Sequence, residues 1–377
     1  MERGTIAIAG ALMLVSGCYS GLGAGDGTEG DTEGTTAVGE GTVTDGGAGP
    51  DGSPGSNPDG GPGGTNDPGD SGGTTSSPDP DTGTASSDPS ATTAPDPDTG
   101  GSDTGTDPAV EAMCDRWLAD RIDLSEGAWS GSVGACNPGD VSASGRANAL
   151  RVLNLYRWMV GLPAVINDAG RDAMAQACAL LMHANGMLSH DPPMGWTCWS
   201  SDGDTAAGNS NISTGPGVMS VDLYMTDPGN PTTLGHRRWI LSNSTGPVGL
   251  GSTSEYSCMW VLGGAGGGTN AWTAWPPPGP FPFEAVAPLG FASLDQTGWS
   301  LQSDGIDLSG AQVAITVGGD PRPVTVTALA QGYGSTYAIS MIPSGWTVQP
   351  DTTYHVRVDG VAGGPIEYDV QVVTCGG

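Results

Sequence analysis

The chain has 377 residues, and its 11 basic residues, all Arg, face 41 acidic residues, which gives a formal charge of −30. This imbalance excludes nucleic acid as a partner, because no basic patch is available to neutralise phosphates. The 65 Gly and 30 Pro are concentrated in one N-terminal block, whose composition is typical of disorder. The N-terminal block and the remaining chain therefore have to be interpreted separately.

The N-terminus has the pattern of an export signal. Residues 6–15 form a ten-residue apolar run, too short to span a bilayer but typical of a signal-peptide core. The following Ser16-Gly17-Cys18 resembles the bacterial lipobox, which predicts a signal peptide over residues 1–18 and a membrane anchor through lipidation of Cys18. By analogy with known lipoproteins, Tyr19 in place of an acidic residue after the cysteine favours an outer-membrane or cell-surface location. The alternative is an ordinary secretory signal that contains a cysteine.

Residues 19–108 are composed mainly of Gly, Ser, Thr, Pro and acidic residues, without any Arg. Such a segment cannot bury enough apolar surface to offset its conformational entropy. We therefore expect a disordered acidic linker, whose ends lie roughly 50 Å apart as a random coil. It serves either as a stalk that holds a folded domain away from a membrane or as a plain spacer.

Six cysteines remain after Cys18, and an even number in an exported chain indicates three disulfides with fifteen possible connectivities. Proximity in sequence favours Cys114–Cys136 and Cys178–Cys198. Cys258 would then pair with Cys375 and hold the C-terminus against the first folded domain.

The first folded part, residues 109–282, begins with helical patterns and continues with strand-like runs. Apolar spacing and capping residues predict four helices, over residues 143–160, 167–186, 218–225 and 233–241. Short runs between Gly-rich turns predict three strands, over residues 248–252, 257–262 and 271–275. This order indicates an α+β domain.

Several motifs in this part occur in the order seen in the CAP superfamily, also called SCP, which contains the cysteine-rich secretory, antigen 5 and pathogenesis-related proteins. They are Leu155-Tyr156-Arg157, Gly161-Leu162-Pro163, Leu188-Ser189-His190, Asn211-Ile212, Tyr224-Met225-Thr226-Asp227 and Gly235-His236-Arg237-Arg238-Trp239-Ile240-Leu241. The last motif, followed by Val248-Gly249-Leu250-Gly251, resembles the bacterial branch. The resemblance covers about residues 145–275. It implies an α-β-α sandwich with a cleft that in many members carries two His and two Glu, and in some binds zinc.

The resemblance assigns the cleft residue by residue. His190 and His236 match the two family histidines, and Asn211 matches the Asn of the Gly-Glu-Asn-Ile motif. Ser210 stands in place of one Glu, and Asp227 in place of the other. If zinc binds, its ligands would be His190, His236 and Asp227, since serine is a poor zinc ligand.

Other interpretations compete with a functional site. His190 and His236 could be hydrogen-bonded structural residues that join loops to the sheet, and Arg237 and Arg238 are expected in surface ion pairs. The sequence contains no His-Glu-x-x-His helix and no Gly-x-Ser-x-Gly elbow. No catalytic residue can be named from it.

Residues 283–377 alternate apolar and polar positions, which predicts a smaller antiparallel β-sandwich of about seven strands. The run Asp351-Thr352-Thr353-Tyr354 resembles the tyrosine corner of immunoglobulin-like domains. His355, Arg357 and Asp359 alternate with the apolar positions and should face solvent. The proline-rich residues 276–282 are expected to form a stiff hinge between the two domains.

These observations lead to two hypotheses for the function. In the first, a surface-tethered lipoprotein presents a non-catalytic CAP domain that binds a small apolar ligand, a peptide or a wall component. In the second, the same cleft belongs to a metal-dependent hydrolase of peptide or wall material. The replacement of one family Glu by Ser210 and the shortening of the other to Asp227 favour the first.

Overall fold

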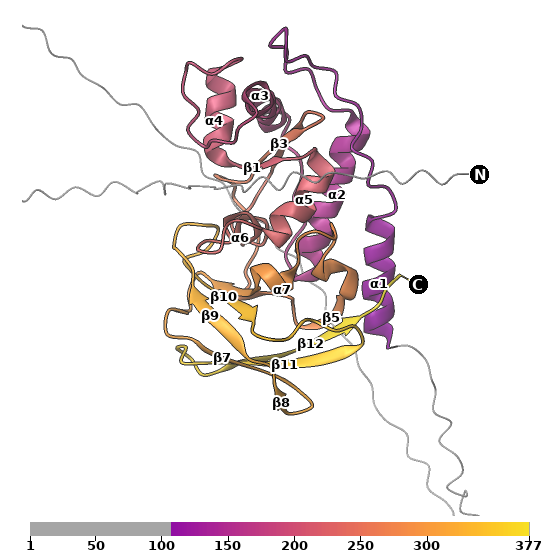
Figure 1. Cartoon of the computed structure of the whole chain (residues 1–377), viewed down its shortest axis with the longest axis vertical. Coiled ribbons are helices and arrows are strands. Elements are labelled where there is room, and N and C mark those ends of the chain that lie inside the picture. Colours follow the sequence, from indigo (N-terminus) through magenta and orange to yellow (C-terminus); the bar gives the residue numbers. More distant parts are fainter. Residues whose placement is uncertain (1–106, 377) are drawn as a thin grey trace, which may run out of the picture. The chain divides into compact units, whose positions relative to one another are not determined.

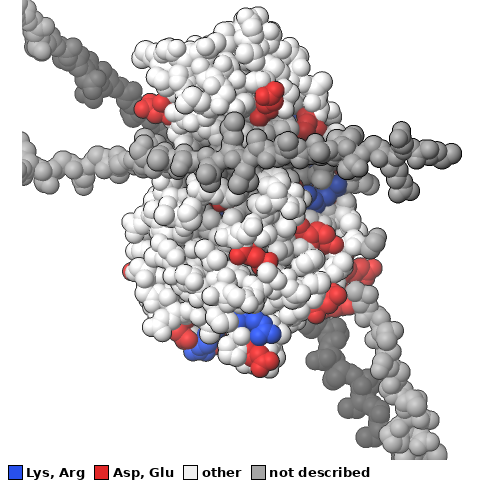
Figure 2. Space-filling view, in the orientation of Figure 1, with Lys and Arg blue, Asp and Glu red and all other residues white. Residues whose placement is uncertain are grey.

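The computed structural model describes residues 107–376, all of which belong to one compact unit. The predicted signal peptide, Cys18 and nearly all of the acidic linker lie outside the described residues. No helix within residues 107–376 has both the length and the apolar character needed to cross a membrane. Figure 2 shows acidic side chains scattered over the visible face with few basic ones between them.

The N-terminal part of this unit contains six helices and three strands. They are α1 (Pro108–Asp120), α2 (Ala143–Met159), α3 (Ala169–Asn185), α4 (Ser201–Asn209), β1 (Ser210–Thr214), α5 (Gly217–Thr226), α6 (Gly235–Ile240), β2 (Gly249–Ser252) and β3 (Tyr256–Trp260). The strands form an antiparallel sheet in the order β1-β3-β2. The predictions did not include α1, α4 and β1.

This small sheet is buried on both faces, which produces the α-β-α arrangement seen in Figure 1. Cys258 of β3 and its partner Ile212 of β1 point into a core made with α3 and α4. Met259, the next residue of β3, and Leu250 opposite it on β2 point into a core made with α2 and α5. Neighbouring residues of a strand face opposite sides, so the two cores lie on the two faces of the sheet.

Local capping signals determine where two of these helices begin and end. The Ser142 side chain accepts a hydrogen bond from Gly145 N at the start of α2, and Asp168 does the same for Arg171 N at the start of α3. Gly186 ends α3 in the left-handed conformation, with φ of 61°, which glycine adopts without strain. The boundaries predicted for these two helices are therefore confirmed to within two residues.

The C-terminal part of the unit consists of two sheets. Its elements are β4 (Thr273–Trp275), β5 (Gly279–Pro282), η1 (Phe283–Val286), α7 (Leu294–Thr297), β6 (Trp299–Ser303), β7 (Gln312–Val317), β8 (Asp320–Pro321), β9 (Val324–Ala328), β10 (Tyr337–Pro343), β11 (Thr352–Asp359) and β12 (Ile366–Val373). The sheet orders are β4-β6-β10-β9 and β5-β12-β11-β7-β8. We call this part the β region.

The proline-rich run is not a hinge, contrary to the prediction. Its residues 279–282 form β5, which pairs in parallel with β12, and Trp275 before it is buried. The Trp275 ring packs edge-on against Tyr156 of α2 and Phe281 of β5, with ring centroids 5.4 and 5.1 Å apart. One apolar core thus runs from the helices into the β region, and it includes Trp275 and Phe281.

Two buried arginines add polar contacts between the same two parts. Arg237 donates to the carbonyl oxygens of Met225 and Gly298, at 2.7 and 2.8 Å. Arg238 donates to the carbonyl oxygens of Ala330 and Ser335, at 2.6 and 2.9 Å. The prediction of surface ion pairs was wrong, because both guanidinium groups are fully buried and bind main-chain carbonyls.

Within the β region, Tyr354 makes the contact that a tyrosine corner predicts. Its hydroxyl accepts a hydrogen bond from the backbone N–H of Gln349, five residues upstream, at 2.8 Å. The side chains of His355, Arg357 and Asp359 are 42–48% exposed, as predicted for the solvent face of β11. An immunoglobulin-like identity for this region stays a prediction.

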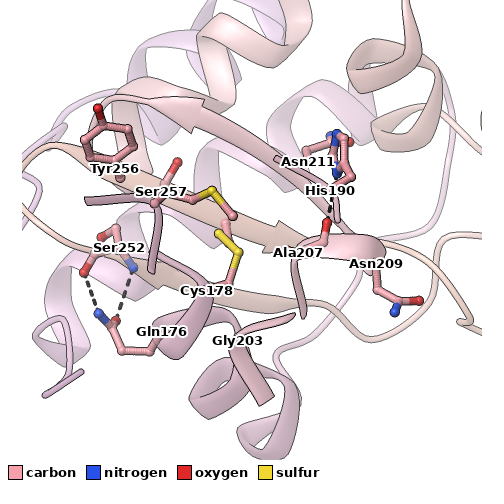
Figure 3. Close-up of a disulfide and its surroundings, with 12 residues drawn as sticks. Gln176, Cys178, His190, Gly203, Ala207, Asn209, Asn211, Ser252, Tyr256 and Ser257 are labelled. Atoms are coloured by element: carbon pink, nitrogen blue, oxygen red, sulfur yellow. Dashed lines mark hydrogen bonds between the residues drawn. A yellow bond between two sulfur atoms is a disulfide. The ribbon is translucent and has the colours of Figure 1, made fainter. Parts of the chain in front are cut away.

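Three disulfides are present, as predicted, but their pairing differs. The bonds are Cys114–Cys375, Cys136–Cys198 and Cys178–Cys258. Proximity in sequence failed because α3 packs against β3, which places Cys178 of α3 opposite Cys258, 80 residues further along the chain (Figure 3). The C-terminus is held against the first part as expected, although its anchor is in α1.

Candidate functional site

Asp227 is the residue that organises the predicted site. It follows α5 in the left-handed conformation, with φ of 52°, and its side chain is completely buried. One carboxylate oxygen accepts the backbone N–H groups of His236 and Arg237 at 3.0 and 3.3 Å. The other accepts the Asn230 amide at 2.7 Å and His236 Nδ1 at 2.9 Å. Asp227 therefore fixes both the start of α6 and the imidazole that α6 carries.

His236 is oriented by this carboxylate and by an aromatic neighbour. Its side chain is 18% exposed, and its ring lies 5.1 Å from that of Tyr224. Because a carboxylate can only accept, Nδ1 is the donor of this bond, which in the neutral imidazole places the lone pair on Nε2. His236 Nε2 has no hydrogen-bond partner within residues 107–376. It is therefore a candidate acceptor for a ligand donor.

His190 lies in the loop between α3 and α4 and is held from its Nδ1 side as well. Nδ1 lies 2.8 Å from the carbonyl oxygen of Ala207, to which it donates (Figure 3). The pKa of His190 is lowered to about 4, mainly because the side chain is buried. The hydrogen bond to Ala207 raises this pKa, and the nearby His236 lowers it. The two imidazoles are thus close enough to influence each other, and His190 is neutral at pH 7.

Asn211 connects the sheet to this pair. Its amide donates to the carbonyl oxygen of His236 at 3.1 Å, and its own carbonyl accepts the Tyr224 hydroxyl at 3.1 Å. Asn211 Oδ1 and the hydroxyl of the preceding Ser210 are buried without a partner in the described part of the chain. Since such atoms destabilise a fold unless something binds them, they are candidate contacts for a bound molecule or water.

The predicted zinc ligands are not arranged as three ligands around one point. No cluster of three or more His, Cys, Asp or Glu within residues 107–376 could hold a metal ion. Both oxygens of Asp227 already accept hydrogen bonds, two of them from His236. Asp227 therefore acts on His236 instead of standing beside it as a ligand. The arrangement leaves two imidazole nitrogens, and a metal here stays a prediction.

Two residues of the site were missed by the sequence analysis. Asn230 donates to Asp227, and Tyr224 packs on the His236 ring and binds Asn211. Tyr224 lies in one of the quoted motifs, whereas nothing in the sequence distinguishes Asn230. Burial raises the pKa of Tyr224 to about 12, although its serine neighbours lower it, so it is a neutral hydrogen-bond donor.

The chemistry available here is that of two oriented imidazoles, of which His190 is neutral at pH 7. A carboxylate-oriented histidine resembles the base of a catalytic triad. However, no hydroxyl or thiol of the described residues is bonded to His236 Nε2, so the nucleophile of such a triad has no counterpart.

Residues 150–262 match the family model described as the cysteine-rich secretory protein family, CAP. Every residue assigned to the site lies inside this range. No curated protein and no solved structure matches the chain.

Proposed function

We propose that this protein, whose residues 150–262 form a CAP domain, is a surface-tethered, non-catalytic binding module. The CAP domain and three disulfides indicate an exported, extracellular protein. A lipid on Cys18 and the acidic linker after it would keep the folded unit at the outer membrane or cell surface.

One observation carries the binding role: the Asp227–His236 pair lies beside a neutral His190 without a nucleophile bonded to it. Both imidazoles donate through Nδ1, to Asp227 and to Ala207. His236 Nε2, together with the buried Asn211 Oδ1, is an acceptor. Acceptors select a ligand that supplies N–H or O–H groups, as a peptide or a wall component does. They fit a small apolar ligand less well.

The experiment measures co-sedimentation of the full chain with isolated bacterial cell wall. His236→Ala should reduce the bound fraction, because it removes the oriented acceptor. His355→Ala is the matched control, since His355 is an exposed histidine in the β region. Mass spectrometry of the supernatant should find no released wall fragments. Equal binding of His236→Ala and the parent chain would refute the proposal, and released fragments would favour a hydrolase.

The second candidate, a metal-dependent hydrolase, is favoured by one feature of the same site. Metal-binding histidines usually donate their other N–H to a carboxylate or a carbonyl, as His236 and His190 do here. Zinc, if bound, would supply a Lewis acid and an activated water, while Asp227 and Ala207 would only orient the imidazoles.

Calorimetry with zinc tests this candidate. Binding that disappears in His236→Ala would support it, and Ser210→Glu, which restores the family residue, should strengthen the binding. Thermal unfolding must first establish that Ser210→Glu still folds, because the Ser210 side chain is buried. Zinc binding that is unchanged in His236→Ala would place the metal elsewhere.

A further inference from the structure

A pocket of about 330 Å³ lies between the CAP domain and the β region, outside the histidine site. The CAP domain contributes Trp239 of α6 and Ser244 after it. The β region contributes Asp304 after β6 and the loop between β9 and β10, whose residues include Gln331, Ser335 and Thr336. We call this space the junction pocket.

The wall formed by the β9–β10 loop is held rigidly against α6. Arg238 donates to Ala330 O and Ser335 O, and its guanidinium carbon lies 5.8 Å from the centre of the Tyr333 ring. Gly334 has φ of 71°, and a Cβ at this position would come within 2.5 Å of the carbonyl oxygen of Arg238. Only glycine permits this approach, so the junction pocket is pre-formed.

The lining combines one flat aromatic ring with hydrogen-bonding groups of complementary kinds. Trp239 is half-buried and supplies the ring. Gln331 is exposed and its amide both donates and accepts, and Thr336 and Ser244 supply hydroxyls. The exposed Asp304 carboxylate accepts two long bonds, from Asn243 at 3.2 Å and Thr336 N at 3.4 Å. An ionised carboxylate offers about four acceptor positions, so Asp304 can accept more.

This combination is suited to a sugar ring. A pyranose has C–H groups on a flat face, which pack on an aromatic ring whose face is electron-rich. Its edge carries hydroxyls that both donate and accept, which matches a carboxylate beside an amide. A volume of about 330 Å³ is at the lower end of the range for small-molecule sites, which is enough for one or two rings.

The charge of the lining restricts the sugar further. Asp304 is the one charged residue among those that line the junction pocket in the described part of the chain, and the whole chain carries a charge of −30. Both features repel an anion. These features exclude an acidic sugar.

We propose that the junction pocket binds a neutral saccharide, with one pyranose ring stacked on Trp239 and its hydroxyls bonded to Asp304 and Gln331. This site is separate from His190 and His236 and does not depend on the function proposed for them. Because the two walls come from the CAP domain and the β region, a bound sugar also links these two parts.

The test uses ligand-detected NMR titration of the purified full chain with cellotriose and with N,N′,N″-triacetylchitotriose. Saturable binding with a Kd of about 1 mM or tighter is expected for at least one of them. Trigalacturonic acid, which is anionic, should bind more weakly than the neutral sugar. Asp304→Ala should weaken binding about tenfold, because it removes an ionised acceptor, and Gln331→Ala should weaken it about fivefold.

Matched controls are Asp320→Ala and Gln312→Ala, which change exposed residues of the same types in β8 and β7. Both should bind like the parent chain. Trp239→Ala should abolish binding. If Trp239→Ala fails to fold, Asp304→Ala and Gln331→Ala still test the proposal. Both side chains are exposed, so these two variants should fold like the parent chain. The proposal is overturned if neither neutral sugar binds, if the anionic sugar binds equally well, or if both variants bind like the parent chain.

Discussion

Acid should destabilise this protein through His190, and replacement by Gln should remove that effect. Burial and the nearby His236 lower the pKa of this imidazole to about 4 in the folded chain, against about 6.5 in the unfolded chain. Between these two values the unfolded state binds a proton that the folded state does not. The free energy of unfolding therefore falls as the pH falls from 6.5 to 4, and His190 has no effect on it above that window.

The size of the effect follows from the two pKa values. At pH 4.5 the linkage relation makes the His190 contribution about 2.5 kcal/mol of lost stability relative to pH 7. The Gln side chain can still donate to the Ala207 carbonyl but does not titrate. His190→Gln should therefore lose about 2.5 kcal/mol less than the parent chain over the same pH change.

Urea denaturation of the oxidised full chain at pH 7 and pH 4.5 measures this difference. Carboxylates titrate in the same range, and comparison of the parent chain with His190→Gln cancels their contribution. In His236→Ala the pKa of His190 should rise while burial still holds it below 6.5, so the acid-dependent loss should be smaller but still present. If parent and His190→Gln lose equal stability, within about 0.5 kcal/mol, the argument from burial fails.

Three further predictions concern the anchor, the disulfides and the buried arginines. Cys18→Ala should move the protein from the membrane fraction to the soluble fraction of a bacterial host, and a variant that still sediments with membranes would contradict the lipobox. Cys114→Ser with Cys375→Ser opens a loop of 261 residues and should lower the free energy of unfolding by about 2–5 kcal/mol; denaturation without a change in midpoint would mean that this bond does not restrain the chain. Arg237→Met leaves several buried carbonyls without a donor and should lower stability by about 3–5 kcal/mol, whereas the exposed Arg357→Met should leave it almost unchanged. Similar losses in these two variants, measured by urea denaturation, would contradict the burial argument.

Local sequence signals accounted for much of the fold. The caps of α2 and α3 at Ser142, Asp168 and Gly186 act within one or two turns of the chain, and for that reason they could be read without knowing any tertiary contact. The alternating strands of the β region followed from a period of two that burial on one face imposes. The helix α4 was missed because its sequence, with two Gly and two Asp among nine residues, has weak helix propensity and is held by packing on α3.

The sequence predicted which residues of the candidate site lie near one another, but not how they are arranged. The family motifs placed His190, Asn211, Asp227 and His236 in one region, and hydrogen bonds join the last three of them. The role of Asp227 could not be predicted from the motif, because an acidic residue at this position could either bind a metal ion or orient the His236 imidazole. The distinction depends on the left-handed turn after α5, which directs the carboxylate at the start of α6.

The sequence by itself determined the acidic charge, the export pattern, the helix boundaries and the types of residue at the site, because these depend on composition and on neighbours along the chain. Only the tertiary structure decided which cysteines pair, which arginines are buried and where the junction pocket lies. Each of these depends on which faces pack together: Cys178 meets Cys258 because α3 lies on β3, and Arg238 binds Ser335 because the β9–β10 loop lies against α6. Contacts between segments so far apart in the chain leave no local pattern in the sequence. Any thiol that the fold placed beside Cys178, or any acceptor that it placed beside Arg238, could make the same contact.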